Sequence, residues 1–273
     1  MIVTVEHATT YRYDRPVRGV VQSHRLTPAR FDGQTVLAWH VGVSDGTPGG
    51  AFRDGAGDWV QSHSAHGPLS EITVTVTGRI ETRDLAGVLR GHRERIPAQA
   101  YLRDTAPTRP DKALVSLARD AVAGANGDLD RAHRLCAAVE EAIAYRPGAT
   151  HAHTTAAEAL SLGEGVCQDH AHALIAAARS QDLPARYVSG YLGSDGQDAE
   201  AAAEAAHAWA EIWVGGLGWV GFDAANGCCP DERYIRLGSG FDSRSASPIR
   251  GIARGEAEES LDVTVSVRAE QQQ

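Results

Sequence analysis

Alternation of apolar and polar positions marks the first 95 residues as rich in β-strands. Three runs alternate in this way, at residues 2–13, 36–44 and 71–81. In the third run the isoleucine and valines share one face and the threonines take the other, which is typical of a half-buried strand. Clusters of Gly, Asp and Pro separate the runs. We therefore predict an antiparallel, β-sandwich-like region over residues 1–95.

Residues 96–110 contain three prolines and form a predicted linker. After it, hydrophobic residues recur every three to four positions instead of every second position. Two helix faces are visible, the first made by Leu114, Leu117, Ala118 and Val122 and the second by Leu129, Ala132, Leu135, Cys136, Val139 and Ile143. A short helix at 155–162 and a helix beginning at Cys167 follow. We then expect strands at 185–192, 207–214 and 219–223, with a polar, alanine-rich loop at 193–206.

The last part of the chain returns to strand-like alternation. Residues 261, 263, 265 and 267 are apolar and fall on one face. This segment could therefore pair with the N-terminal sheet. We treat residues 246–273 as a C-terminal segment.

Composition narrows the classes of partner. The chain has 273 residues, of which 42% are hydrophobic and 22% charged, so it can bury a core. Its net charge is −9, which argues against nucleic acid and against an anionic membrane surface. No apolar run is long enough to span a bilayer, and the first residues lack the basic and apolar parts of a secretory signal. Four cysteines, two of them adjacent, do not make a disulfide framework, so we expect a cytoplasmic protein.

The segment with the most chemical content reads Gly-Glu-Gly-Val-Cys and ends at Cys167. Its two glycines let the backbone turn tightly and deliver the cysteine to the first turn of the predicted helix. The free N–H groups and the dipole of a helix start favour an anion there, so this thiol is a candidate nucleophile. Taken alone, a free cysteine is more often a small buried apolar residue.

Two downstream residues supply partners for that thiol. His207 stands in Ala-His-Ala-Trp-Ala-Glu, and Asp223 ends Gly-Trp-Val-Gly-Phe-Asp. A nucleophile, a base and an orienting carboxylate thus occur in order along the chain. Separately, His207 could be an ordinary strand histidine, and Asp223 could be a turn residue before Asn226. The three together favour catalysis.

A glycine-rich turn between the two strands allows a geometric prediction. Residues 215–218 read Gly-Gly-Leu-Gly, a strong hairpin signal. If the hairpin centres on Gly215, His207 lies directly opposite Asp223. Side chains directly opposite each other share one face and can interact, whereas a slip of one residue would separate them.

Several motifs together resemble the bacterial transglutaminase-like proteins of the papain-like cysteine superfamily. They are the Gly-Glu-Gly-Val-Cys-Gln-Asp segment around Cys167, Pro-Ala-Arg-Tyr-Val-Ser-Gly-Tyr ending at Tyr191, His-Ala-Trp-Ala-Glu from His207, and Gly-Trp-Val-Gly-Phe-Asp ending at Asp223. Residues 10–16 and 23–28 resemble the β-rich N-terminal region of that family, and residues 248–252 resemble its C-terminal segment. The resemblance covers nearly the whole chain.

The resemblance implies an α+β fold, in which the β-rich region precedes a papain-like transglutaminase core at residues 111–245. It implies a catalytic triad of Cys167, His207 and Asp223, with the cysteine at a helix N-terminus. The implied reaction is acyl transfer from a peptide or protein amide through an acyl-enzyme, with water or an amine as acceptor. No calcium-loop pattern is present, and we expect neither a metal nor a cofactor.

Two positions depart from the family pattern. His170 stands where an aromatic residue is common, and Ala224-Ala225 where a Pro-Thr pair is common. His170 lies one helical turn after Cys167, so it could tune the thiolate or narrow the cleft. We expect the Cys167 N–H to stabilise the oxyanion, with His170 and Trp209 as further candidates for the oxyanion site or cleft.

Two alternatives remain open at this point. Cys167, His170 and His207 could form a three-ligand zinc site, although no His-Glu-x-x-His or paired Cys-x-x-Cys motif is present. The chain could also be a non-catalytic binding or scaffold protein on the same core. Within the enzymatic reading, hydrolysis and transamidation share one triad, so the sequence does not separate an amidase or protease from a transglutaminase.

Overall fold

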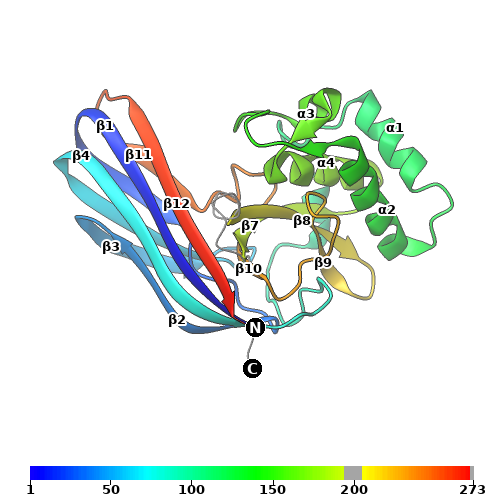
Figure 1. Ribbon diagram of the computed structural model, residues 1–273, viewed down its shortest axis with the longest axis horizontal. Helices are drawn as coiled ribbons and strands as arrows, with labels where there is room; N and C mark the ends of the chain where they lie inside the picture. The colour runs from blue at the N-terminus through cyan, green and yellow to red at the C-terminus, as the bar shows by residue number, and fades with distance from the viewer. Residues whose placement is uncertain (194–204, 271–273) are drawn as a thin grey trace.

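Two long antiparallel strands dominate the N-terminal half of the protein. We describe residues 1–193 and 205–270 from a computed structural model. Strand β1 (Ile2–His24) pairs with β4 (Trp59–Thr82) over most of its length, with irregular register between Arg12 and Gly19. Figure 1 shows the resulting sheet as an elongated slab beside the helical core.

Shorter strands extend the slab on both sides. On one side β4 pairs with β2 (Gln34–Val43) and β3 (Gly46–Arg53). On the other side β1 pairs with β11 (Ile249–Ala253) and β12 (Glu259–Glu270), so the two ends of the chain lie in one sheet (Figure 1). All six strands belong to a single hydrogen-bonded sheet. The long strands each hold two partners end to end. The inner face of this sheet packs against Tyr191, Ile235 and Leu237, which belong to a second sheet in the core.

The second half of the chain places four helices against a four-stranded antiparallel sheet (Figure 1). The helices are α1 (Lys112–Ala121), α2 (Gly127–Ala142), α3 (Ala156–Leu162) and α4 (Cys167–Ser180). The sheet has the order β10 (Tyr234–Gly240), β7 (Ala185–Leu192), β8 (Ala206–Val214), β9 (Gly218–Phe222). A 3₁₀-helix, η1 (Ala98–Leu102), and two short parallel strands, β5 (Ala144–Tyr145) and β6 (Glu164–Gly165), complete the core. The predicted α+β class is confirmed.

Helix α4 is the centre of this core. Its residues from Asp169 to Arg179 are all buried, and its run of alanines lets α1, α2, α3 and the sheet approach closely. The surrounding helices begin with caps that the sequence supplies: Asp111 accepts from Leu114 N at 2.8 Å, and Thr155 forms a reciprocal capping box with Glu158. The start of α4 is therefore fixed in space from several directions.

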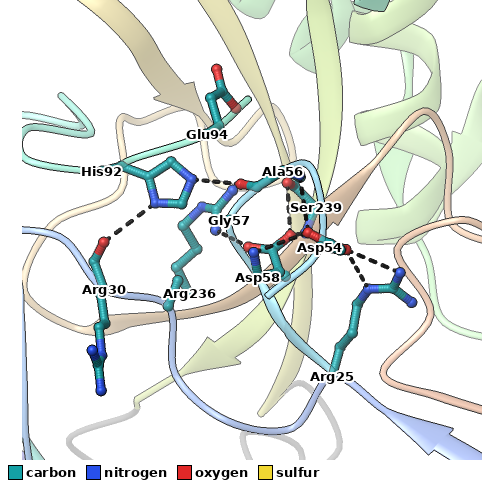
Figure 2. Close-up of polar contacts among 12 residues, drawn as sticks. Arg25, Arg30, Asp54, Ala56, Gly57, Asp58, His92, Glu94, Arg236 and Ser239 are labelled. Carbon is teal, nitrogen blue, oxygen red and sulfur yellow. Dashed lines mark hydrogen bonds and ion pairs between the residues drawn. The ribbon is translucent and has the colours of Figure 1, made fainter. Parts of the chain in front are cut away.

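A buried ionic cluster joins the six-stranded sheet to the core (Figure 2). Arg236 on β10 donates to Asp58 at 2.8 Å and to Glu211 on β8 at 2.8 Å. Asp58 also accepts from the backbone N–H of Ser239 at 2.6 Å and from its hydroxyl at 3.0 Å. Asp58, Arg236 and Glu211 are at most 2% exposed, so the N-terminal sheet supplies a counter-ion to the core.

The cluster continues through a second buried arginine. Arg186 on β7 donates to Glu211 at 2.6 Å and pairs with Glu94, which precedes η1. The indole N–H of Trp219 donates to Glu94 at 2.5 Å, and the Arg186 guanidinium lies 4.0 Å from the Trp219 ring centroid. The segment predicted as a linker also contributes a buried contact, since the Tyr101 ring packs edge-on against Trp219 at 5.3 Å.

The alanine-rich loop predicted at 193–206 lies mostly outside the described residues. Among the helices of the described residues, none is long and apolar enough to cross a membrane. The cytoplasmic location stays a prediction.

Candidate active site

Glycines and an aspartate build the backbone that carries Cys167. Gly163 ends α3 at a φ of 69°, a left-handed conformation that favours glycine. A Cβ at Gly165 would lie 2.7 Å from the Asp169 side chain, so close approach also requires glycine there. Asp169 accepts from Val166 N at 2.8 Å and from the Thr150 hydroxyl at 2.6 Å, which caps α4. Cys167 is consequently held half-buried in the first turn of the helix.

The predicted histidine and aspartate meet at the ends of β8 and β9. His207 Nε2 lies 2.6 Å from Asp223 Oδ2, and the two residues are 6% and 1% exposed. This contact uses Nε2 and leaves the other ring nitrogen, Nδ1, facing away from Asp223. The charge of Cys167 also acts on the imidazole. The structure brings all three sequence-predicted residues to one place.

The register of the β8–β9 hairpin differs from the prediction. Glu211 lies opposite Gly221, so His207 is two residues away from the position directly opposite Asp223. The reason is that the turn centres one residue later than predicted, on Gly216, whose φ is 84°. A shift of two residues keeps side chains on the same face because strands alternate with a period of two. The pair therefore meets diagonally.

Asp223 is surrounded by hydrogen-bond donors. Besides His207, it accepts from the Tyr234 hydroxyl at 2.8 Å, from Asn226 Nδ2 at 2.7 Å and from Ala225 N at 3.0 Å. Burial alone raises the pKa of the Asp223 carboxyl, but these donors and the His207 charge outweigh it and lower that pKa below its usual value. Asp223 is thus fixed as an anion beside the imidazole.

The pKa of His207 is strongly raised. Burial by itself lowers the pKa of the imidazole, but the hydrogen bond to Asp223 and the charges on Asp223 and Cys167 raise it to about 10. At neutral pH the ring is then an imidazolium between a carboxylate and a thiol. An imidazolium at this position can stabilise negative charge on its neighbours.

The other three cysteines lie in different surroundings. Burial and then the nearby Asp223 charge raise the pKa of Cys136. Burial also raises the pKa of Cys228, and it raises that of Cys229 to about 11. These thiols are protonated at neutral pH, and thiols react as nucleophiles only when ionised.

His170 serves the backbone instead of the cleft. It is 2% exposed, and its ring nitrogens lie 3.0 Å from Val166 O and 2.8 Å from Ile143 O. The ring therefore ties the start of α4 to the end of α2. Both nitrogens are already engaged, which leaves none for a metal ion or an oxyanion. Among the described residues, no group of three or more His, Cys, Asp or Glu is arranged to hold a metal.

Trp209 packs against His207 and Tyr234. It is 3% exposed and packs edge-on against Tyr234, with ring centroids 5.5 Å apart. Its ring also stacks on His207 at 6.4 Å. A side chain buried to this extent can hold the imidazole in place, but it is not exposed to donate a hydrogen bond to a substrate.

Two tyrosines at the site were missed from the sequence. Tyr234 holds Asp223, and Tyr187 on β7 packs beside the start of α4, where burial and then the Cys167 charge raise the pKa of its hydroxyl well above the usual value. Tyr187 falls within the motif around Pro-Ala-Arg-Tyr-Val, which was the available signal. Tyr234 stands in no motif, so only the fold reveals it.

Comparisons with known proteins agree with the fold and the motifs. Residues 115–224 match the model of the transglutaminase-like superfamily, and residues 3–81 match that of the bacterial transglutaminase-like N-terminal region. An uncharacterized protein of Mycobacterium leprae is 31% identical over 277 residues, which cover 96% of this chain and 97% of the relative. An uncharacterized protein of Mycobacterium tuberculosis is 43% identical over 131 residues, which cover 45% of this chain and 42% of the relative.

A solved structure shares the whole fold. The crystal structure of a proposed cysteine protease from Cytophaga hutchinsonii superposes with a TM-score of 0.74 at 18% identity, covering 100% of this chain and 92% of that one. At this identity the likeness concerns the fold alone. With the two family models and the full-length relative, it shows that the chain belongs to the transglutaminase-like superfamily.

Proposed function

We propose that the protein is a cysteine-dependent acyl transferase or hydrolase acting on peptide-like amides. The supporting observation is the position of His207, a buried imidazolium that contacts Asp223 at 2.6 Å and interacts with Cys167. In the proposed reaction the Cys167 thiolate attacks the amide carbonyl, and the His207 N–H protonates the departing amine. Asp223 holds the ring and balances its charge.

The second half of the reaction releases the acyl group. Water or a primary amine, activated by the now neutral His207, attacks the thioester carbon, and the Cys167 thiolate leaves. The backbone N–H of Cys167, at the start of α4, is the proposed donor to the tetrahedral oxyanion. Both acceptors use the same groups, so the choice between amidase and transamidase activity depends on which acceptor reaches the thioester.

Trapping the acyl-enzyme tests this function. Intact protein is incubated with a panel of glutamine peptides, cell-wall peptides and small esters, and the mass added to Cys167 is read by peptide mapping. Addition of a fluorescent primary amine then separates transamidation from hydrolysis. Cys167→Ser is the matched control, since it keeps the size of the side chain but removes the thiolate.

The same experiment addresses the non-catalytic alternative. A binding or scaffold protein on this core would show no acyl adduct with any donor, and its Cys167 would react with iodoacetamide no faster than an ordinary thiol. That pair of results would overturn the proposed activity.

A further inference from the structure

The N-terminal sheet contains a cavity that is separate from the candidate active site. Its volume is about 680 Å³, and its lining comes from the ends of β1 and β4, from β2 and β3, and from the segment after β1. Cys167, His207 and Asp223 are not among the lining residues. Pockets of this volume are typical of sites for small molecules.

The charged side chains that line the cavity are all positive. Arg30 and Arg53 line it, and no aspartate or glutamate does, although the chain as a whole carries a net charge of −9. Within residues 1–193 and 205–270, neither guanidinium forms an ion pair. Figure 2 shows the Arg30 side chain pointing away from the buried ionic cluster. Asp58 acts on Arg53 from outside the lining, but no carboxylate lines the cavity itself, so its two cations favour an anion there.

The Arg30 charge acts on Arg53. Burial and then the neighbouring Arg30 charge lower the pKa of Arg53. The Arg53 guanidinium donates to Gly57 O at 2.8 Å and lies 5.5 Å from the Trp59 ring centroid, which fixes its position. A guanidinium remains charged at neutral pH, so an anion bound between the two would relieve their repulsion and accept hydrogen bonds from both.

The floor of the cavity is polar but neutral. His24 and His63 stack with ring centroids 4.7 Å apart and are 1% and 8% exposed. Burial lowers the pKa of His24 to about 4 and lowers that of His63 as well, so both rings are uncharged at neutral pH. Nδ1 of each ring has no hydrogen-bond partner among the described residues. Both nitrogens are buried, so they do not face the open space of the cavity.

The walls are aromatic and aliphatic. Trp39 and Trp59 line the cavity together with Leu26, Phe31 and Val41. The Trp39 indole N–H donates to Leu26 O at 2.9 Å, which fixes that ring. Fixed aromatic walls next to a cationic rim suit a molecule that has an apolar body and a single anionic group.

From this cavity we propose that the N-terminal sheet binds a small molecule with an apolar or aromatic body and one carboxylate or phosphate, which Arg30 and Arg53 receive at the rim. The site is independent of the acyl-transfer chemistry proposed for Cys167. It gives the N-terminal region a binding role of its own.

Isothermal titration with matched probes tests the site. Protein alkylated at Cys167 is titrated with phenylacetate against phenylacetamide, and with phenyl phosphate against phenol, so that each pair differs in charge on a similar body. Inorganic phosphate serves as the probe without an apolar body. We expect at least one charged probe to bind about 10-fold or more tightly than its neutral partner, because charge-assisted hydrogen bonds are the strong ones. The two pairs distinguish a carboxylate from a phosphate ligand.

Variants locate the binding. Arg30→Gln and Arg53→Gln should each weaken the charged probe about 10-fold and leave the neutral probe unchanged, since each removes one charged donor. Arg15→Gln, at an exposed arginine elsewhere on β1, is the control and should bind as the wild type does. Charged and neutral probes that bind alike, or no charged probe that binds below about 10 mM, would overturn the proposal. Unchanged affinity in both rim variants would overturn it as well.

Discussion

The Arg236 guanidinium of β10 lies 2.8 Å from the carboxylate of Asp58, which immediately precedes β4. This contact crosses from the core to the N-terminal sheet and is buried on both sides. Arg236 and Arg186 share Glu211, and each has a second counter-ion: Asp58 pairs with Arg236, and Glu94 pairs with Arg186. The two halves of the protein therefore depend on each other for charge compensation.

Asp58→Asn tests that dependence. The change leaves Arg236 buried with one counter-ion fewer, and breaking a buried pair in this way costs about 3–5 kcal/mol of the free energy of unfolding. Urea denaturation of the variant against the wild type measures the loss. Asp14→Asn, at an exposed position of β1, is the control and should change stability by less than about 0.5 kcal/mol. Equal stability of Asp58→Asn and wild type would show that solvent already screens Arg236.

The sequence predicted the helices, the core strands β7, β8 and β9, and the meeting of Cys167, His207 and Asp223, because each depends on local period or on a motif. It missed the fourth core strand, β10. It did not predict the ionic cluster. Arg186, Glu211 and Arg236 alternate with apolar residues along their strands, a pattern that ordinarily indicates a solvated face. Contacts from distant parts of the chain bury them: Asp58 reaches Arg236, and Glu94 and Tyr101 cover Arg186. The register of the β8–β9 hairpin was wrong by two residues because the sequence does not say which glycine centres the turn.

Cys167 is expected to be the first of the four cysteines to react. The pKa values of Cys136, Cys228 and Cys229 are all raised by burial, whereas Cys167 lies beside the His207 imidazolium. Limiting iodoacetamide at pH 6–7, followed by peptide mapping, gives the order of labelling. His207→Gln should slow the labelling of Cys167 and leave the other three unchanged. Earlier labelling of Cys228 would contradict the assignment.

The pH dependence of turnover should reflect His207. Its pKa is raised from 6.5 to about 10, so the ring keeps the proton that it gives to the leaving amine until the pH approaches 10. Activity should fall above that value. In the free energy of unfolding, the protonated ring is stabilising below about pH 6.5, and this contribution is lost as the pH rises through 10. A profile of kcat/KM from pH 6 to 11 checks the alkaline limb, and a limb near 6.5 would show that Asp223 does not hold the charge.

Asp223→Asn should fold but lose most of its activity. His207, Tyr234 and Asn226 donate to Oδ2, and Ala225 N donates to Oδ1. An amide N–H in place of either oxygen would therefore oppose at least one donor. The imidazolium would also lose its counter-charge. Comparable triads lose about 10⁴-fold when this carboxylate becomes an amide, and we expect a fall in kcat/KM on the order of 10²–10⁴-fold. Near wild-type kcat/KM at wild-type stability would assign Asp223 to the turn alone.

Tyr234→Phe separates positioning from charge at the same carboxylate. The change removes the 2.8 Å hydrogen bond to Asp223 Oδ2 and keeps the ring that packs against Trp209. A hydrogen bond to a charged group is worth about 1.5–3 kcal/mol, so stability and kcat/KM should both fall, the latter by about 10-fold. The hydroxyl is also one of the donors that lower the pKa of Asp223, so its loss raises that pKa. The acid limb of the kcat/KM profile should then move to higher pH, which a purely structural defect would not cause.

In the double variant with Asp223→Asn, the change of Tyr234 to phenylalanine should cost little further activity, because its effect acts through the carboxylate. Full additivity of the two changes would mean that Tyr234 acts elsewhere.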